Sequence, residues 1–148
     1  MDTQLTHRWV EDKSGLVDLE RSLETGSSLS LDSESNSGFV YQERLCLLQI
    51  NDGRRVWLVD LLALSSDRSA LDSLRPFLED PTYEIQLHGG EFDVGCLKRD
   101  YEINLGGVWD TQQAASFLGW EKTGYGAVVE GVCGIVLPKA HTRSDWSR

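Results

Sequence analysis

The stretch Leu29-Ser30-Leu31-Asp32-Ser33-Glu34 alternates apolar and polar side chains, which is typical of a half-buried β-strand. Side chains two positions apart on a strand point to the same face, so we expect Leu29 and Leu31 in the core and Asp32 and Glu34 on the opposite side. Two neighbouring carboxylates repel each other and raise each other's pKa unless a cation lies between them. This spacing by itself favours a solvent-facing strand edge, and a metal-binding pair is the alternative.

The segments around this strand predict an antiparallel meander. A helix over residues 16–24 precedes it, with leucines at helical spacing. It is followed by a dense apolar run over 45–50, a turn at Asn51-Asp52-Gly53-Arg54 and a returning strand over 56–61. Three consecutive antiparallel strands therefore follow the first helix.

The second half of the chain predicts strand–helix units. The expected elements are a helix over 69–78, a strand over 83–88, a helix over 94–101, an extended piece over 106–110, a helix over 111–118 and a weak, glycine-containing helix over 124–134. Asp110 or Thr111 is expected to cap the helix that begins at 111. This order indicates an α/β fold with a mixed central β-sheet flanked by helices. The 148 residues are one domain's length and no linker interrupts them, so a single domain over 1–148 is expected.

A second group of candidate residues is His88-Gly89-Gly90-Glu91-Phe92-Asp93, at the junction of a strand and a helix. Such junctions commonly carry the sites of α/β sheets, and glycine lets the backbone turn sharply there. Asp93 would project from the first turn of the helix. Seen alone, Asp93 is better explained as a helix-capping carboxylate and His88 as a hydrogen-bonded structural histidine.

The third group is the basic segment Lys139-Ala-His-Thr-Arg143-Ser-Asp-Trp146. Basic side chains interleaved with an aromatic ring suit a sugar-phosphate strand, although a frayed tail has the same composition.

Composition limits the classes of function. The net charge of −10 disfavours a protein that coats nucleic acid by neutralising phosphates. No apolar run is long enough to span a membrane and no secretion signal is apparent, so a cytoplasmic protein is expected. Cys46, Cys96 and Cys133 are an odd, widely spaced set, which favours buried free thiols over a disulfide or a zinc site.

Taken together, these segments resemble the motifs of ribonuclease D-like proteins, which belong to the DEDD 3′→5′ exonucleases. The matching segments are Leu31 to Ser37 with Tyr41 to Ile50, His88 to Asp93 with Leu97 to Tyr101, Trp109 to Gly119, and Leu137 to Trp146. No single motif is specific, but four in the family's order and spacing are hard to obtain by chance. The resemblance runs from about Val10 to the last residue.

The resemblance implies a ribonuclease H-like fold. It also implies hydrolysis of single-stranded nucleic acid, RNA more than DNA, from the 3′ end to nucleoside monophosphates. Two divalent metal ions, Mg²⁺ or Mn²⁺, would take part, because hard oxygen ligands select these ions. By position, Asp32 would bridge the metals, Glu34 would bind one and orient the water, and Asp93 would hold the other. His88, Lys139 and Arg143 would contact the nucleic acid.

The resemblance departs at one point. The family's fourth acid lies in a Tyr/His-x-x-x-Asp motif beyond the Ser-Asp-Trp segment, and these 148 residues do not contain it. Asp145 belongs to the preceding segment and does not replace that acid. We therefore expect the 148-residue chain to be a poor exonuclease and to self-associate through apolar surface that the missing helix would cover.

A function of another class stays open, namely a non-catalytic module that binds nucleic acid or a protein on the same fold. The lack of the last motif favours this alternative, whereas the retention of Asp32, Glu34 and Asp93 favours the exonuclease.

Overall fold

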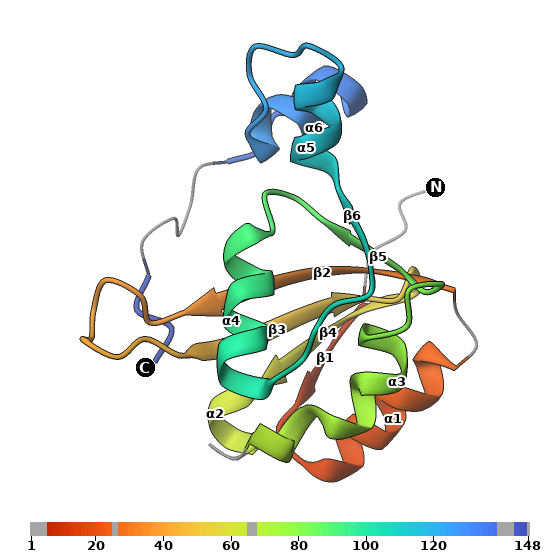
Figure 1. Cartoon of the computed structure of the whole chain (residues 1–148), viewed down its shortest axis with the longest axis vertical. Coiled ribbons are helices and arrows are strands. Elements are labelled where there is room, and N and C mark those ends of the chain that lie inside the picture. Colours follow the sequence, from red (N-terminus) through yellow and green to blue (C-terminus); the bar gives the residue numbers. More distant parts are fainter. Residues whose placement is uncertain (1–5, 25–26, 65–67, 139–143, 148) are drawn as a thin grey trace.

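The computed structural model describes residues 6–24, 27–64, 68–138 and 144–147. Its centre is a six-stranded sheet with the order β1-β4-β3-β2-β5-β6 (Figure 1). The strands are β1 (Thr6–Val10), β2 (Ser28–Ser35), β3 (Leu45–Asn51), β4 (Arg55–Asp60), β5 (Glu84–Leu87) and β6 (Gly107–Asp110). Strands β2, β3 and β4 form the expected antiparallel meander. Strands β1, β5 and β6 pair in parallel with β4, β2 and β5.

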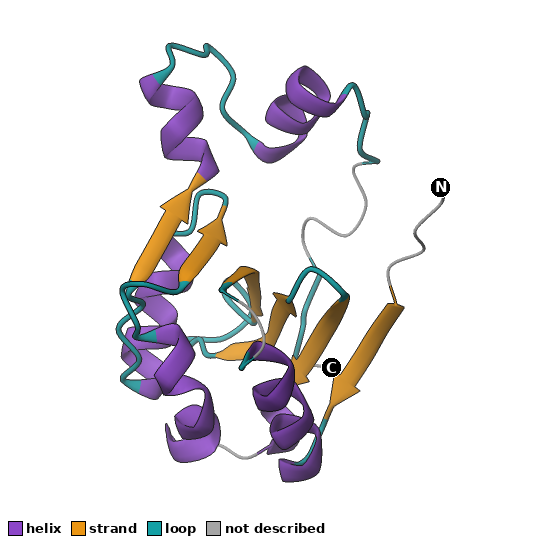
Figure 2. Cartoon of the chain, turned by 90° about the vertical axis from the view of Figure 1, so that its right-hand side faces the viewer, coloured by secondary structure: helices purple, strands orange, loops and turns teal. Residues whose placement is uncertain are grey.

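Helices separate the parallel strands and cover the sheet. They are α1 (Lys13–Leu23), α2 (Leu61–Leu64), the 3₁₀ helix η1 (Arg68–Leu74), α3 (Arg75–Leu78), α4 (Glu91–Tyr101), α5 (Thr111–Phe117) and α6 (Tyr125–Cys133). Of these helices, α1, α3 and α4 lie against the sheet (Figures 1 and 2). Leucines of α1, η1 and α3 pack with the apolar residues of β2 to β5 in one buried core. The predicted mixed sheet with flanking helices is confirmed.

Three elements differ from the sequence prediction. Residues 69–78, expected as one helix, form η1 followed by α3. Pro76 lies in the first turn of α3, where its ring restricts the preceding residue and removes one N–H, so the helix restarts there. Leu71, Leu74 and Leu78 are nevertheless all buried, as their spacing predicted. The other differences are the strand β1 and the short helix α2, neither of which was predicted from the sequence.

Part of the surface also differs from expectation. Cys46 and Cys96 are buried free thiols, but Cys133 is exposed on α6, so the expectation of burial was wrong for that residue. Helix α6 buries none of its side chains, and Phe117 and Leu118 at the end of α5 are 88% and 77% exposed. Self-association through this apolar surface stays a prediction. No helix among the described residues has the length and apolar character needed to cross a membrane.

The predicted turn between β3 and β4 is held by Asp52. Its carboxylate accepts hydrogen bonds from the backbone N–H groups of Arg54 and Arg55, at 2.8 and 2.9 Å, from the indole N–H of Trp57 at 2.8 Å, and from the hydroxyl of Ser22 on α1. Burial raises the pKa of this carboxyl, but the hydrogen bonds outweigh it and lower the pKa to about 2. The turn is thereby tied to α1 as well as to β4.

This arrangement predicts an acid-sensitive contribution to stability. The folded pKa of Asp52 lies below its unfolded value, so the stabilisation is complete above pH ~4 and is lost as the pH falls towards 2. At pH 7, Asp52→Asn should lower the free energy of unfolding by about 1–2 kcal/mol. Urea titrations at pH 7, 4 and 3 should show that the difference in free energy of unfolding between wild type and Asp52→Asn becomes smaller as the pH falls. If this difference does not change with pH, the stabilisation comes from neutral hydrogen bonds alone.

Candidate active site

Two of the three candidate acids lie on β2, between β3 and β5. Leu29 and Leu31 are buried on the helix side of this strand, and Asp32 and Glu34 belong to the opposite face, as their alternation predicted. Asp32 pairs with Gln49 of β3, and the register shifts between Glu34 and Ser35. The acids therefore lie at the end of a central strand, where regular pairing stops.

Asp93 reaches the same region from α4. It lies in the first turn of this helix and is only 8% exposed. The hydroxyl of Ser33, which lies between the two strand acids in sequence, donates a hydrogen bond to Asp93 Oδ1. The N-cap of α4 is Gly90 and no side chain caps the helix, so the capping explanation for Asp93 was wrong.

Neighbouring carboxylate charges act on both strand acids. Burial raises the pKa of Asp32, and the charge of Asp93 raises it further. Burial also raises the pKa of Glu34, together with the charges of Asp32 and Asp93. Asp32 stays exposed at the surface although the surrounding protein displaces part of its water. The result is a patch of mutually repelling carboxylates.

Such a patch has the donor chemistry of a site for a hard divalent cation, because a cation would relieve the repulsion and find oxygen ligands. Within the described parts of the chain, no three His, Cys, Asp or Glu side chains are arranged closely enough to hold a metal ion. The carboxylate of Asp93 is instead turned to the hydroxyl of Ser33.

The turn that delivers Asp93 is fixed by Asp110. Gly89 adopts a left-handed conformation with φ = 67°, which favours glycine, as the sequence predicted for this turn. The carboxylate of Asp110 accepts from the N–H groups of Gly89 and Gly90 at 3.0 and 2.9 Å, and it also accepts from Gln112 N and Gln113 N as the N-cap of α5. One side chain thus joins the start of α4 to the start of α5.

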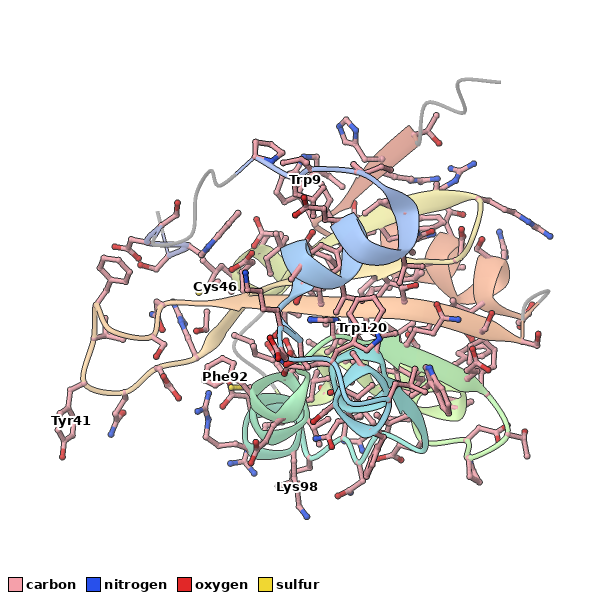
Figure 3. The ribbon with its side chains drawn as sticks, turned by 90° about the horizontal axis from the view of Figure 1, so that it is seen from above. Trp9, Tyr41, Cys46, Phe92, Lys98 and Trp120 are labelled. Carbon is pink, nitrogen blue, oxygen red and sulfur yellow. The ribbon has the colours of Figure 1, made fainter. Side chains whose placement is uncertain are left out.

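His88 lines a cleft of about 500 Å³ beside Asp32. Its Nδ1 lies 2.9 Å from the hydroxyl of Thr111, and its ring meets the ring of Tyr125 edge-to-face with centroids 5.2 Å apart. Lys139 and Arg143 lie outside the described residues. Tyr41, another residue of the matching segments, stands fully exposed on the loop between β2 and β3 (Figure 3).

The supporting residues of the site were not predicted from the sequence. Asp110 and Thr111 were expected only as helix caps, and no role was expected for Ser33. The motif order carried a signal for Asp110, because parallel β5 and β6 bring the ends of both strands to one edge of the sheet. The role of Ser33 depends on the packing of α4 against β2, for which the sequence has no local signal.

Comparison with known proteins assigns the family. A family model described as a 3′-5′ exonuclease matches residues 7–148. The chain belongs to this 3′-5′ exonuclease family. It is similar to ribonuclease D of Pseudomonas paraeruginosa, with 36% identity over 140 residues, which are 94% of this chain and 36% of that protein.

Solved structures carry the same fold. Ribonuclease D of Escherichia coli superposes with a TM-score of 0.82 at 27% identity, over 96% of this chain and 37% of that one. The catalytic core of RRP6 from Trypanosoma brucei superposes with a TM-score of 0.89 at 23% identity, over 99% of this exonuclease chain and 40% of that core. The exonuclease chain therefore spans well under half the length of these relatives.

Proposed function

We propose that this exonuclease domain hydrolyses single-stranded RNA from the 3′ end and releases nucleoside monophosphates. The observation that carries the proposal is that Asp32 and Glu34 lie on one face at the end of β2 while Asp93 faces the same strand from α4. Burial raises the pKa of Asp32 and Glu34, and neighbouring carboxylate charges raise it further. A structural carboxylate cluster would ordinarily be paired with Arg or Lys. Among the described residues, no Arg or Lys lowers the pKa of Asp32 or Glu34, and the only charge that lowers that of Asp32 is the charge of His88. The exonuclease family supports the same reading. We also place the protein in the cytoplasm, in keeping with its free buried thiols.

The proposed roles follow from the position of each side chain. Asp32, central on the patch, would hold two divalent cations, Mg²⁺ or Mn²⁺, and Asp93 would hold one of them from the side of α4. Glu34 would bind the other cation and orient the attacking water. Ser33 would orient the Asp93 carboxylate through its hydrogen bond when that carboxylate binds a cation. When bound, the cations would supply Lewis acidity and neutralise charge at the scissile phosphodiester.

The test is an exonuclease assay on single-stranded RNA labelled at its 5′ end, with Mn²⁺ and with EDTA as the control. The protein is used in molar excess over RNA so that slow hydrolysis can be detected. We expect Mn²⁺-dependent shortening from the 3′ end and nucleoside monophosphate as the product. Binding of RNA without any shortening would contradict the proposal and favour a non-catalytic binding module.

The basic segment predicts a second, weaker effect. Reversing two charges in Lys139→Glu/Arg143→Glu should weaken RNA binding several-fold and lower its salt dependence, since each phosphate contact releases counterions. Fluorescence anisotropy at several salt concentrations measures both quantities. The matched control is Lys13→Glu/Arg21→Glu, which changes the net charge equally on α1, a helix that contributes no residue to the cleft. Equal losses in both double variants would mean that only net charge matters.

A further inference from the structure

The cleft beside Asp32 is lined by many polar side chains. Side chains from the strand face opposite the core line it, among them Ser30, Gln49, Asn51 and Gln86, with His88, Thr111 and Tyr125 at one end. Its volume of about 500 Å³ is in the range of small-ligand sites, which are about 300–1,000 Å³. These walls present hydroxyl, amide and imidazole groups, and Asp32 adds a carboxylate.

The hydrogen bonds of Thr111 fix the proton position on His88. A threonine hydroxyl has one proton, and the Thr111 hydroxyl donates it to the carbonyl of Leu87 at 3.0 Å. Towards His88 Nδ1, 2.9 Å away, the same oxygen can therefore only accept. The proton of the neutral ring must then be on Nδ1, which leaves Nε2 as a hydrogen-bond acceptor.

This acceptor is buried, and no described group satisfies it. Nε2 of His88 is a buried side-chain atom without a hydrogen-bond partner among the described residues. Tyr125 packs its ring against the imidazole and restricts its rotation. Because an unsatisfied buried polar atom is unfavourable, an atom of this kind beside a cleft calls for a ligand that supplies a donor.

We infer that His88 Nε2 accepts a hydrogen bond from the ribose 2′-hydroxyl of the bound strand, and that His88 thereby selects RNA over DNA. This inference rests on the proposed function. A phosphate has no proton to donate at neutral pH, and the donors of a base are the same in RNA and DNA. The 2′-hydroxyl is the donor that distinguishes RNA. Asp32 borders the same cleft, so the selected sugar lies next to the proposed site of hydrolysis.

The test compares the binding of oligo(U) and oligo(dU) of equal length, because uracil has no amino group that could bind Nε2 in either strand. Fluorescence anisotropy in Ca²⁺ at pH 8 measures binding independently of hydrolysis. Wild type should bind oligo(U) about 10-fold more tightly than oligo(dU), which corresponds to one hydrogen bond. His88→Ala should bring this ratio near one by weakening oligo(U) binding alone. The matched control is His7→Ala, an exposed histidine on β1, which should keep the wild-type ratio.

A second pair of variants tests the fixed proton position. Thr111→Val keeps the shape but removes the acceptor for Nδ1–H, and it should lower the ratio partly, whereas Thr111→Ser should retain it. A wild type that binds both sugars equally would overturn the inference. Equal weakening of both strands by His88→Ala would do the same, since it would mean that His88 acts structurally or through a group that RNA and DNA share. If neither strand binds, the proposed function itself is wrong.

Discussion

Asp32→Asn is expected to reduce Mn²⁺-dependent shortening of RNA by about 10²–10⁴-fold, because loss of the central acid removes metal-borne stabilisation worth several kcal/mol. Asp93→Asn should have a similar effect from the side of α4. Glu11→Gln, an exposed carboxylate between β1 and α1, is the control and should leave the rate unchanged. The measurement is the initial rate of 3′ shortening under the conditions of the proposed assay.

The same substitution should act in the opposite direction on stability. Without a cation, neutralising Asp32 removes repulsion from Asp93 and Glu34, so the metal-free variant should be more stable than wild type by up to about 1 kcal/mol. This gain is modest because Asp32 is exposed. Urea denaturation in EDTA measures it. An Asp32→Asn variant that is less stable than wild type in EDTA would contradict the repulsion on which the site is built.

Asp110→Ala is expected to lower the free energy of unfolding by about 2–4 kcal/mol, from the lost cap of α5 and the unsatisfied N–H groups of Gly89 and Gly90. It should also slow hydrolysis, because the turn that positions Asp93 loses its anchor. Thermal or urea unfolding measures the loss of stability, and the exonuclease assay measures the change in the rate of hydrolysis. A stability loss with an unchanged rate would show that the turn positions Asp93 without Asp110.

The control for Asp110 is the equivalent residue of α1. Asp12 is the N-cap of α1 and accepts from Gly15 N at 2.9 Å, but it touches no part of the site. Asp12→Ala should lower the free energy of unfolding less than Asp110→Ala does, and it should leave hydrolysis unaffected. Burial raises the pKa of Asp110, but its backbone hydrogen bonds outweigh this and lower the pKa overall. Its contribution should therefore be present at neutral pH and lost as the pH falls through the lowered pKa, below about 4.

Much of the fold was accessible to sequence reasoning because it depends on local patterns. The alternation in β2, the Asn51–Arg54 turn and the cap at Asp110 are each determined by a few neighbouring residues. The Gly89 turn likewise needs only one residue that tolerates a positive φ. Asp32, Glu34 and Asp93 could be named from the motifs, and the resemblance rather than any spacing brought them together.

The remaining features depend on tertiary contacts that leave no local pattern. Strand β1 exposes Trp9 and buries Val10, and its place beside β4 follows from the sheet as a whole. The contacts of Ser33 with Asp93 and of Thr111 with His88 depend on how α4 and α5 pack against the sheet.

The most direct test of the carboxylate site is a calorimetric titration of the metal-free chain with Mn²⁺. Wild type should bind Mn²⁺ with measurable heat, and its melting temperature should fall when EDTA is added. Asp32→Ala should abolish both the heat and the EDTA effect, while Glu11→Gln should retain them. A wild-type protein without detectable Mn²⁺ binding and with a melting curve insensitive to EDTA would contradict the claim that Asp32, Glu34 and Asp93 form a cation-binding site.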